Sequence, residues 1–278
     1  MAMTAPTTAW RDSEARAVPG RPLVEAFGLD AALAARALRG SDGPAFVVAL
    51  VGAGGKTSIA HALADELASR RLRVVITTTT KMSLELALIT DVVEALGRLA
   101  SLQFGGVVVA GEPVGGEKFG GFGPDGLAAL RSTCDVLIIE ADGSRRLPIK
   151  VPGEYEPVVP PETDLLLVVT GLTSLGRPLG EACCRAELAP QAVGAELQPT
   201  DTIDVTLVAR LIQAGYLDNE KLAAWLPDRT LVVLNQADDL TAWKLGREIA
   251  EHLPGVHTVL TTSAVSSPTT QAPPHARA

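Results

Sequence analysis

The chain has few cysteines, few aromatic residues and no excess of positive charge. Its 278 residues include three cysteines, Cys134, Cys183 and Cys184, of which the last two are adjacent. An odd count with an adjacent pair provides no disulfide framework, so we expect reduced thiols and a cytoplasmic protein. The 32 acidic residues outnumber the 24 basic ones, which gives a formal net charge of -8. This balance argues against nucleic acid or an anionic membrane as a partner.

Long apolar runs are also lacking. No stretch of about 18 apolar residues occurs, so we expect no membrane-spanning helix. Near the amino terminus, Arg11, Asp12 and Glu14 interrupt the chain before an apolar run develops, which argues against a secretory signal. Apolar residues nevertheless make up 47% of the sequence. That share excludes disorder throughout and is enough for a sizeable core.

Strand and helix patterns alternate along the chain. Continuous apolar runs, which are typical of strands buried on both faces, occur at 46–51, 73–78, 107–110, 136–140, 165–170, 231–234 and 256–261. Helices are expected at 56–69, 83–100, 126–132, 201–214, 219–225 and 241–252, and between a cap at Asp30 and an end at Gly40. The alternation predicts an α/β fold with a doubly wound, mainly parallel sheet and helices on both faces.

One domain is expected over residues 21–264, with an insertion at about 144–225. Residues 1–20 and 265–278 are rich in alanine, threonine and proline and show no periodicity. We therefore expect a disordered N-terminal extension and a disordered C-terminal tail.

A glycine-rich turn joins the strand at 46–51 to the helix at 56–69. The turn and the start of the helix read Gly52, Ala53, Gly54, Gly55, Lys56, Thr57 and Ser58. Glycines let a backbone wrap around phosphates, so that N–H groups and the helix N-terminus face the anion. Lys56 would reach the β- and γ-phosphates, and the Thr57 hydroxyl would ligate Mg²⁺. Although Leu50 stands where the usual pattern begins with glycine, the context predicts a phosphate-loop NTPase.

The strand at 136–140 ends in a carboxylate. Glu140 is its last residue, and Asp142 and Gly143 follow. In phosphate-loop folds an acid at such a strand end holds Mg²⁺ directly or through water, and a glycine can approach the γ-phosphate. We expect Glu140 and Asp142 to serve metal binding and catalysis, and the sequence leaves open which of them touches the ion. The Glu-x-x-Gly form resembles the metal-insertion GTPases of the hydrogenase and cobalamin type.

The strand at 231–234 leads into an element typical of guanine recognition. Asn235 and Asp238 have the Asn-x-x-Asp spacing, in which the aspartate accepts hydrogen bonds from two guanine groups that adenine lacks. Ser263 and Ala264 lie where GTPases place a backbone contact to guanine O6. Gln236 replaces the usual lysine, so the charge is lost while the stem can still pack on a base. We expect GTP, or else ATP, as the bound nucleotide.

Cationic residues near the expected site have two interpretations. Arg145, Arg146 and Lys150 follow the acidic strand and could hold an anionic substrate or stabilise transition-state charge, which makes Arg145 a catalytic candidate. Alternatively, they are solvated loop residues. Residues 77–81 either complete a strand or form a switch near the phosphates.

Two other features are less informative. Lys118 lies in a glycine-rich segment that is either a substrate loop or simply flexible. Cys183 and Cys184 could bind a soft metal, but no third ligand is near them in the sequence.

Five segments resemble the selenium-dependent hydroxylase accessory proteins of the YqeC type. They are residues 50–57, 77–82, 140–144, 147–150 and 171–179, and the similarity covers about residues 44–264. That family is linked to maturation of selenium-dependent molybdenum hydroxylases, so the resemblance implies such a hydroxylase, or its cofactor-maturation proteins, as partners. Members usually carry Asn-Lys-x-Asp and often Val-His-Arg, where this chain has Gln236 and Cys183-Cys184-Arg185.

Taken with the resemblance, the motifs predict a slow, Mg²⁺-dependent GTPase that assists this maturation. Two alternatives stay open at this point. One is a small-molecule kinase in which Arg145, Arg146 and Lys150 hold the acceptor. The other is a nucleotide-gated chaperone without turnover.

Overall fold

The computed structural model describes residues 16–17, 22–37, 43–83, 89–103, 105–115 and 118–263. The expected N-terminal extension, apart from Arg16–Ala17, and the expected C-terminal tail lie outside these residues. The same holds for Gly40 and for Ala264. Among the described residues we find no helix whose length and apolar character would let it cross a lipid bilayer.

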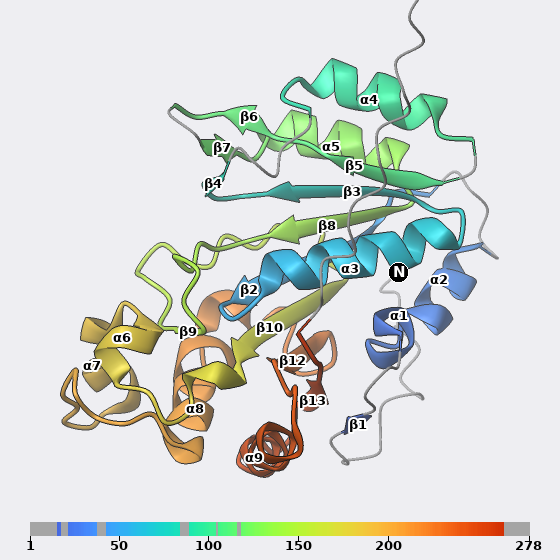
Figure 1. Cartoon of the computed structure of the whole chain (residues 1–278). Coiled ribbons are helices and arrows are strands. Elements are labelled where there is room, and N and C mark those ends of the chain that lie inside the picture. The colour runs from blue at the N-terminus through green and yellow to red at the C-terminus, as the bar shows by residue number, and fades with distance from the viewer. Residues whose placement is uncertain are drawn as a thin grey trace, which may run out of the picture.

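An eight-stranded parallel sheet forms the centre of the molecule (Figure 1). In spatial order its strands are β1 (Arg16–Ala17), β13 (His257–Leu260), β12 (Thr230–Asn235), β10 (Leu165–Gly171), β2 (Phe46–Gly52), β8 (Val136–Glu140), β3 (Arg73–Thr78) and β5 (Gly106–Val109). From β2 the chain winds out to β3 and β5, returns to β8, and then builds the other half through β10, β12 and β13. The strand order therefore reverses beside β2, and open α/β sheets bind ligands at the carboxyl edge of such a point.

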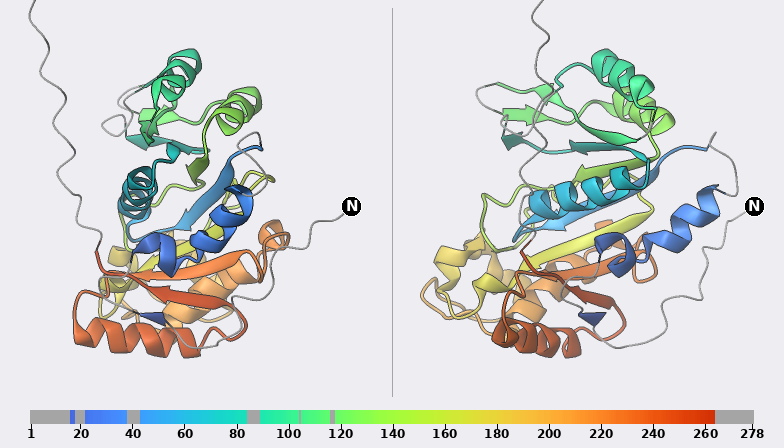
Figure 2. Two further views of the ribbon diagram at one scale, coloured as in Figure 1. Left: turned by 90° about the vertical axis from the view of Figure 1, so that its right-hand side faces the viewer. Right: turned by 45° about the vertical axis from the view of Figure 1, so that its right-hand side comes forward.

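Helices cover both faces of the sheet, as expected from the sequence (Figure 2). Alternate residues of a strand point to opposite faces. On β2, Val48 and Leu50 pack in one core cluster with α3 (Lys56–Ser69) and α1 (Leu23–Ala26). Ala49 and Val51 pack in another cluster, with α8 (Val205–Ile212) and α9 (Leu240–Glu251). A third cluster joins Val47 to α4 (Val92–Ser101) and α5 (Pro124–Thr133).

Several helix predictions are wrong at their boundaries. The helix expected at 83–100 begins only at Val92, because the Asp91 carboxylate caps it by accepting the Glu94 N–H at 2.9 Å. The helix expected at 201–214 begins at Val205, after an equivalent cap by Asp204, and continues as a π-helical turn over Gln213–Leu217. The pattern at 219–225 forms only a 3₁₀ turn, Glu220–Leu222.

The glycine-rich segment after β5 contains two strands that the sequence did not predict. They are β6 (Glu112–Pro113) and β7 (Lys118–Gly120), which form a small antiparallel sheet with β4 (Met82–Ser83). Strands this short carry no detectable alternation of apolar and polar residues.

The segment after β8 adds short elements beside the carboxyl edge of the central sheet. β9 (Ile149–Lys150) pairs with β11 (Cys183–Cys184), and α6 (Leu179–Ala182) and α7 (Ala189–Val193) flank that pair (Figure 1). Within the same expected insertion, 144–225, the chain also returns to the central sheet as β10. A small subdomain is thereby attached to the strand ends where the candidate site lies.

Candidate functional site

The predicted glycine loop lies between β2 and α3 and turns sharply under the helix. Gly54 and Gly55 have φ angles of +83° and +116°, which side chains rarely tolerate. A Cβ on Gly54 would lie 2.1 Å from the backbone nitrogen of Gly171 at the end of β10. Glycine is therefore required at this position by both conformation and space.

Neighbouring strands hold the backbone of this loop. The Ala53 N–H donates to the Val169 carbonyl at 2.9 Å, and the Gly54 N–H donates to the Leu147 carbonyl at 3.1 Å. The Asn235 side-chain amide, at the end of β12, donates to the Gly54 carbonyl at 2.8 Å. The first N–H groups of a helix have no acceptor within the helix. The N–H groups at the start of α3 therefore remain available as donors, and the loop that precedes them is held in place. This arrangement suits an anion.

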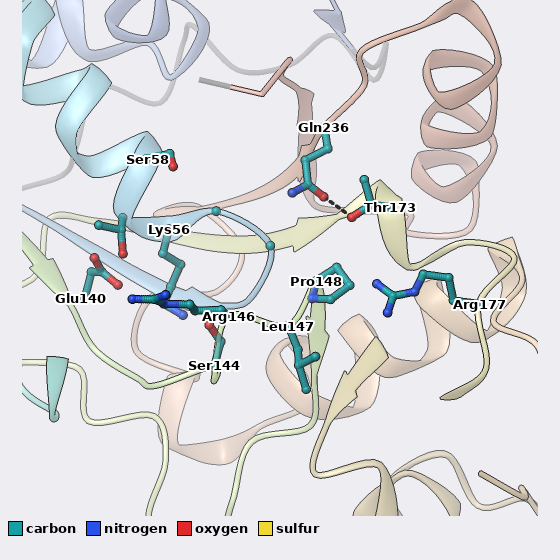
Figure 3. Close-up of a pocket in the computed structure, with 13 residues that line it drawn as sticks. Lys56, Ser58, Glu140, Ser144, Arg146, Leu147, Pro148, Thr173, Arg177 and Gln236 are labelled. Atoms are coloured by element: carbon teal, nitrogen blue, oxygen red, sulfur yellow. Dashed lines mark hydrogen bonds between the residues drawn. The ribbon is translucent and has the colours of Figure 1, made fainter. Parts of the chain in front are cut away.

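A pocket of about 410 Å³ opens above this loop (Figure 3). Its lining comes from four parts of the chain: the loop and start of α3, the end of β8 with the segment after it, the segment after β10, and the residue that follows β12. These residues are Gly54, Gly55, Lys56, Thr57, Ser58, Glu140, Ser144, Arg146, Leu147, Pro148, Thr173, Arg177 and Gln236.

Lys56 is a buried cation, with only 3% of its side chain exposed. Its Nζ atom donates to the Gly52 carbonyl at 2.5 Å and lies 3.0 Å from Asp142 Oδ1. Asp142 Oδ2 accepts the Gly52 N–H at 2.9 Å. Asp142 is not part of the pocket lining, and lies beneath the loop as the counter-ion of Lys56.

Asp142 also begins a chain of alternating charges that leads into the small subdomain. Its Oδ2 atom lies 3.2 Å from Lys150 Nζ, which in turn lies 2.6 Å from Glu156 Oε2. Arg185 closes the chain with two hydrogen bonds to the Glu156 carboxylate, of 2.7 and 3.1 Å. Burial alone would raise the pKa of Glu156, but the hydrogen bonds and charges of Lys150 and Arg185 outweigh it, so the pKa is lowered. Lys150 is thus committed to two carboxylates.

Glu140 is the buried acid that does face the pocket. Its side chain is 4% exposed, and within the described part of the chain no hydrogen-bond partner reaches Oε1. Burial raises the pKa of Glu140, and Lys56 and the Thr57 hydroxyl offset part of that rise. An unpartnered carboxylate oxygen beside the Thr57 hydroxyl has the donor chemistry that Mg²⁺ takes in phosphate-loop sites, where phosphate and water complete the shell. The residues therefore fit the ion.

Protein side chains alone form no metal centre in the described residues. No three or more His, Cys, Asp or Glu side chains among them lie together so that they could hold a metal ion. Cys183 and Cys184 are buried, and burial raises the pKa of Cys183 to about 12, which disfavours a metal-binding thiolate.

Of the residues expected to recognise guanine, Asn235 contacts the glycine loop, while Asn235, Asp238 and Ser263 are absent from the pocket lining. Asn235, besides holding Gly54, accepts a hydrogen bond from the Thr261 hydroxyl at 2.9 Å. The exposed Asp238 carboxylate accepts the Ser263 N–H and its hydroxyl, both at 2.6 Å. Gln236 takes the left-handed conformation, with φ of +69°, and its Oε1 accepts the Thr173 hydroxyl at 2.6 Å (Figure 3). The Asn-x-x-Asp element and Ser263 thus form a connected group, while Ala264 lies beyond the described residues.

The cationic candidates are distributed differently from the expectation. Arg145 and Arg146 are both exposed, and only Arg146 is part of the pocket lining. The sequence reasoning missed Arg177 and Thr173, which reach the pocket from the segment after β10. Both lie in one of the five segments that carry the family resemblance, and that was the only available signal. Lys118 is exposed on β7 and takes no part in the pocket.

Residues 77–81 contribute structure at the strand end. Thr77 and Thr78 are buried in β3, and the Thr78 hydroxyl donates to the Glu140 carbonyl at 2.7 Å. Lys81 is exposed and is not a lining residue. In this structure Thr78 thus holds the carboxyl end of β8 through the Glu140 carbonyl.

Comparison with known proteins identifies relatives for half of the chain. The family model described as "YqeC protein" matches residues 48–187. The chain is also 39% identical over 136 residues to the uncharacterized protein YqeC of Escherichia coli K12. That alignment covers 47% of this chain and 53% of the relative, so the chain spans about half the length of the curated relative it matches. The family match includes the glycine loop, Glu140, Arg146 and Arg177, and it ends before Asn235 and Asp238.

Proposed function

The chain belongs to the YqeC family, and from that premise and the geometry of its glycine loop we propose that it is a phosphate-loop protein that binds a nucleoside triphosphate with Mg²⁺ and hydrolyses it slowly. One observation carries the proposal. Both backbone groups of Gly54 are hydrogen-bonded, its N–H to Leu147 and its carbonyl to Asn235. The loop is thus rigid before any ligand arrives, and it presents the N-terminus of α3 to the pocket.

The position of each residue around the glycine loop indicates its role in the proposal. The α3 amides and Lys56 bind the phosphates, with Lys56 leaving the carbonyl of Gly52 to do so. Thr57 and Glu140 would hold Mg²⁺, which would supply positive charge against the phosphates. Asp142 keeps the loop and Lys56 in position from below. This assignment favours Glu140 over Asp142 as the metal partner.

We infer guanine as the base from the Asn-x-x-Asp element. Each Asp238 oxygen uses one lone pair on Ser263, so each can still accept from guanine N1–H or N2–H₂. Asn235 connects this element directly to the phosphate loop. Adenine has no equivalent pair of donors, which supports GTP over ATP.

The biological role we propose follows from the family resemblance. A GTP cycle in this protein would assist maturation of a selenium-dependent molybdenum hydroxylase, through contact with that enzyme or its cofactor-maturation proteins.

Calorimetry with GTP, ATP and CTP, each with and without Mg²⁺, tests the nucleotide proposal. We expect GTP to bind most tightly and only weakly without the metal. Product analysis then separates the possible activities: free phosphate supports the GTPase, a phosphorylated small molecule indicates a kinase, and binding without product indicates a nucleotide-gated chaperone. Failure of all three nucleotides to bind would refute the phosphate-loop assignment.

A further inference from the structure

Two exposed arginines line the pocket, and they differ from those arginines that pair with carboxylates elsewhere in the fold. Arg73 pairs with Asp135 at 3.1 Å, and Arg185 pairs with Glu156 at 2.7 Å. Within the described ranges no carboxylate pairs with Arg146 or Arg177, although both line the pocket. The whole chain carries a net charge of -8, so two free guanidinium groups in one cavity concentrate positive potential there.

The backbone under each of these arginines is firmly held. Arg146 has φ of +61°, inside a turn closed by the Leu147 N–H and the Ser144 carbonyl at 3.0 Å. The Arg177 carbonyl accepts the Ile203 N–H at 2.9 Å, and the Arg177 N–H donates to Ser174 at 3.2 Å. A left-handed non-glycine residue is a strained feature that often accompanies binding sites. Hydrogen bonds thus fix the backbone positions from which the two exposed side chains extend into the pocket.

The two arginines lie on different sides of an apolar floor made by Leu147 and Pro148. In Figure 3 Arg146 extends beside Lys56 and Glu140, whereas Arg177 points toward Pro148 from the other side. The floor is rigid, because the Leu147 and Pro148 carbonyls accept the N–H groups of Gly54 and Gly171. A triphosphate bound as proposed would run from Glu140 past Lys56 toward Gln236. Arg177 and the floor lie off that line, so they are open to another molecule. Arg146, which precedes Leu147 of the floor and extends toward Lys56 and Glu140, lies where such a molecule would meet the phosphates.

We propose that Arg146, Arg177 and the Leu147–Pro148 floor bind a second substrate: a small organic anion that has a carboxylate or phosphate group on an apolar body. Guanidinium groups suit either head group because they donate two parallel hydrogen bonds. The Ser144 hydroxyl in the pocket lining adds a further donor, whereas the Thr173 hydroxyl already donates its proton to Gln236 Oε1. This inference rests on the proposed function, since the second substrate would lie beside the bound nucleotide. Lys150, in contrast, is excluded from this site by its two buried ion pairs.

Calorimetry with phenyl phosphate and with benzoate tests this site. Each probe is titrated into protein saturated with Mg²⁺ and a non-hydrolysable GTP analogue, so that the phosphate loop is already occupied. We expect at least one probe to bind, and Arg177→Ala to weaken it by about tenfold or more. Arg146→Ala should act likewise, while Arg98→Ala, which removes the same charge from exposed α4, should have no effect. The probe that binds identifies the preferred head group.

Two results would overturn the second-substrate site. One is that neither probe binds the wild-type protein. The other is that Arg177→Ala weakens the GTP analogue as strongly as it weakens the probe, since Arg177 would then be a nucleotide ligand. If the analogue itself does not bind, the proposed function fails separately. The same titrations without nucleotide then test the anion site. Loss of probe binding in Arg177→Ala supports the site, and retention of probe binding contradicts it.

Discussion

Lys56 and Asp142 form a buried ion pair beneath the glycine loop, with Nζ 3.0 Å from Oδ1. A lysine that is to bind phosphate must give up this contact. Asp142 would then keep Lys150 at 3.2 Å and the Gly52 N–H at 2.9 Å. Because Lys150 would still compensate the buried Asp142 carboxylate, it lowers the free-energy cost of releasing Lys56. Lys150 acts as a positioning residue in this proposal.

Replacing Lys56 tests the loop itself. Lys56→Met keeps the buried stem and removes the charge, so affinity for Mg²⁺-GTP should fall by at least about 100-fold, equivalent to about 2.7 kcal/mol. The free energy of unfolding should change much less, since Asp142 retains Lys150 and Gly52 as partners. Calorimetry and urea denaturation measure the two effects. Lys244→Met, on the exposed surface of α9, is the control, and nucleotide binding at wild-type strength by Lys56→Met would contradict the assignment.

Removing the second cation should weaken nucleotide binding from a distance. In Lys150→Met, Asp142 has only Lys56 as a cation and should hold it more tightly, so GTP affinity should fall by about tenfold. Adding Asp142→Asn should restore most of that loss, because the competing charge is gone. A double variant that binds no better than Lys150→Met would show that Lys150 does not act through Asp142. Thermal denaturation of both variants checks that they are folded.

Glu140→Gln should reduce the Mg²⁺ dependence of nucleotide binding. It should also change stability in a pH-dependent way. Because burial raises the pKa of Glu140, its ionisation opposes folding, and this cost grows as the pH rises above about 4.3, the ordinary value for glutamate. The variant should therefore be more stable than wild type at pH 7 and lose this advantage near pH 4. Urea denaturation at both pH values measures the difference, and Glu162→Gln, which is exposed, should show none.

Glu156→Gln should show the opposite pH dependence. The pKa of Glu156 is lowered by Lys150 and Arg185, so its ionised form stabilises the fold above the ordinary glutamate pKa of about 4.3. That contribution is lost as the pH falls through the lowered pKa. The variant should be about 1–3 kcal/mol less stable than wild type at pH 7, and the two should converge in acid. Equal stability at pH 7 would mean that the chain of charges contributes nothing to the fold.

Asp238→Asn tests the choice of base. In the wild type we expect GTP to bind at least about tenfold more tightly than ATP, a difference of about 1.4 kcal/mol. The exposed position of Asp238 limits this preference, because water can replace a missing donor more easily than in a buried site. The variant should shift its preference toward xanthine nucleotides, since an asparagine amide can donate to the xanthine carbonyl. Competition binding with GTP, ATP and xanthosine triphosphate measures the shift, and equal binding of GTP and ATP by both proteins would leave base selection unexplained.

Long local patterns in the sequence were enough to predict the main elements. The helix at 56–69 and the strands at 73–78 and 136–140 agree with α3, β3 and β8 to the residue. These segments have continuous apolar runs or a regular helical stripe, so local chemistry specifies them. The glycine loop is equally local, because its function requires consecutive residues. In contrast, β4, β6 and β7 could not be predicted, because two or three residues are too few to show an alternation of apolar and polar side chains.

The environment of each charge was decided only by tertiary structure. Sequence placed Glu140 and Asp142 two residues apart with the same expected role. In the fold, Glu140 faces the pocket with an unpartnered oxygen, whereas Asp142 turns beneath the loop to Lys56 and Lys150. Lys150 meets Glu156 and Arg185 because β9 pairs with β11, a contact between distant segments that no local pattern encodes. The sequence alone thus determined the glycine loop at which we propose that a phosphate binds, while long-range packing decided which cations pair with carboxylates in the described part of the chain.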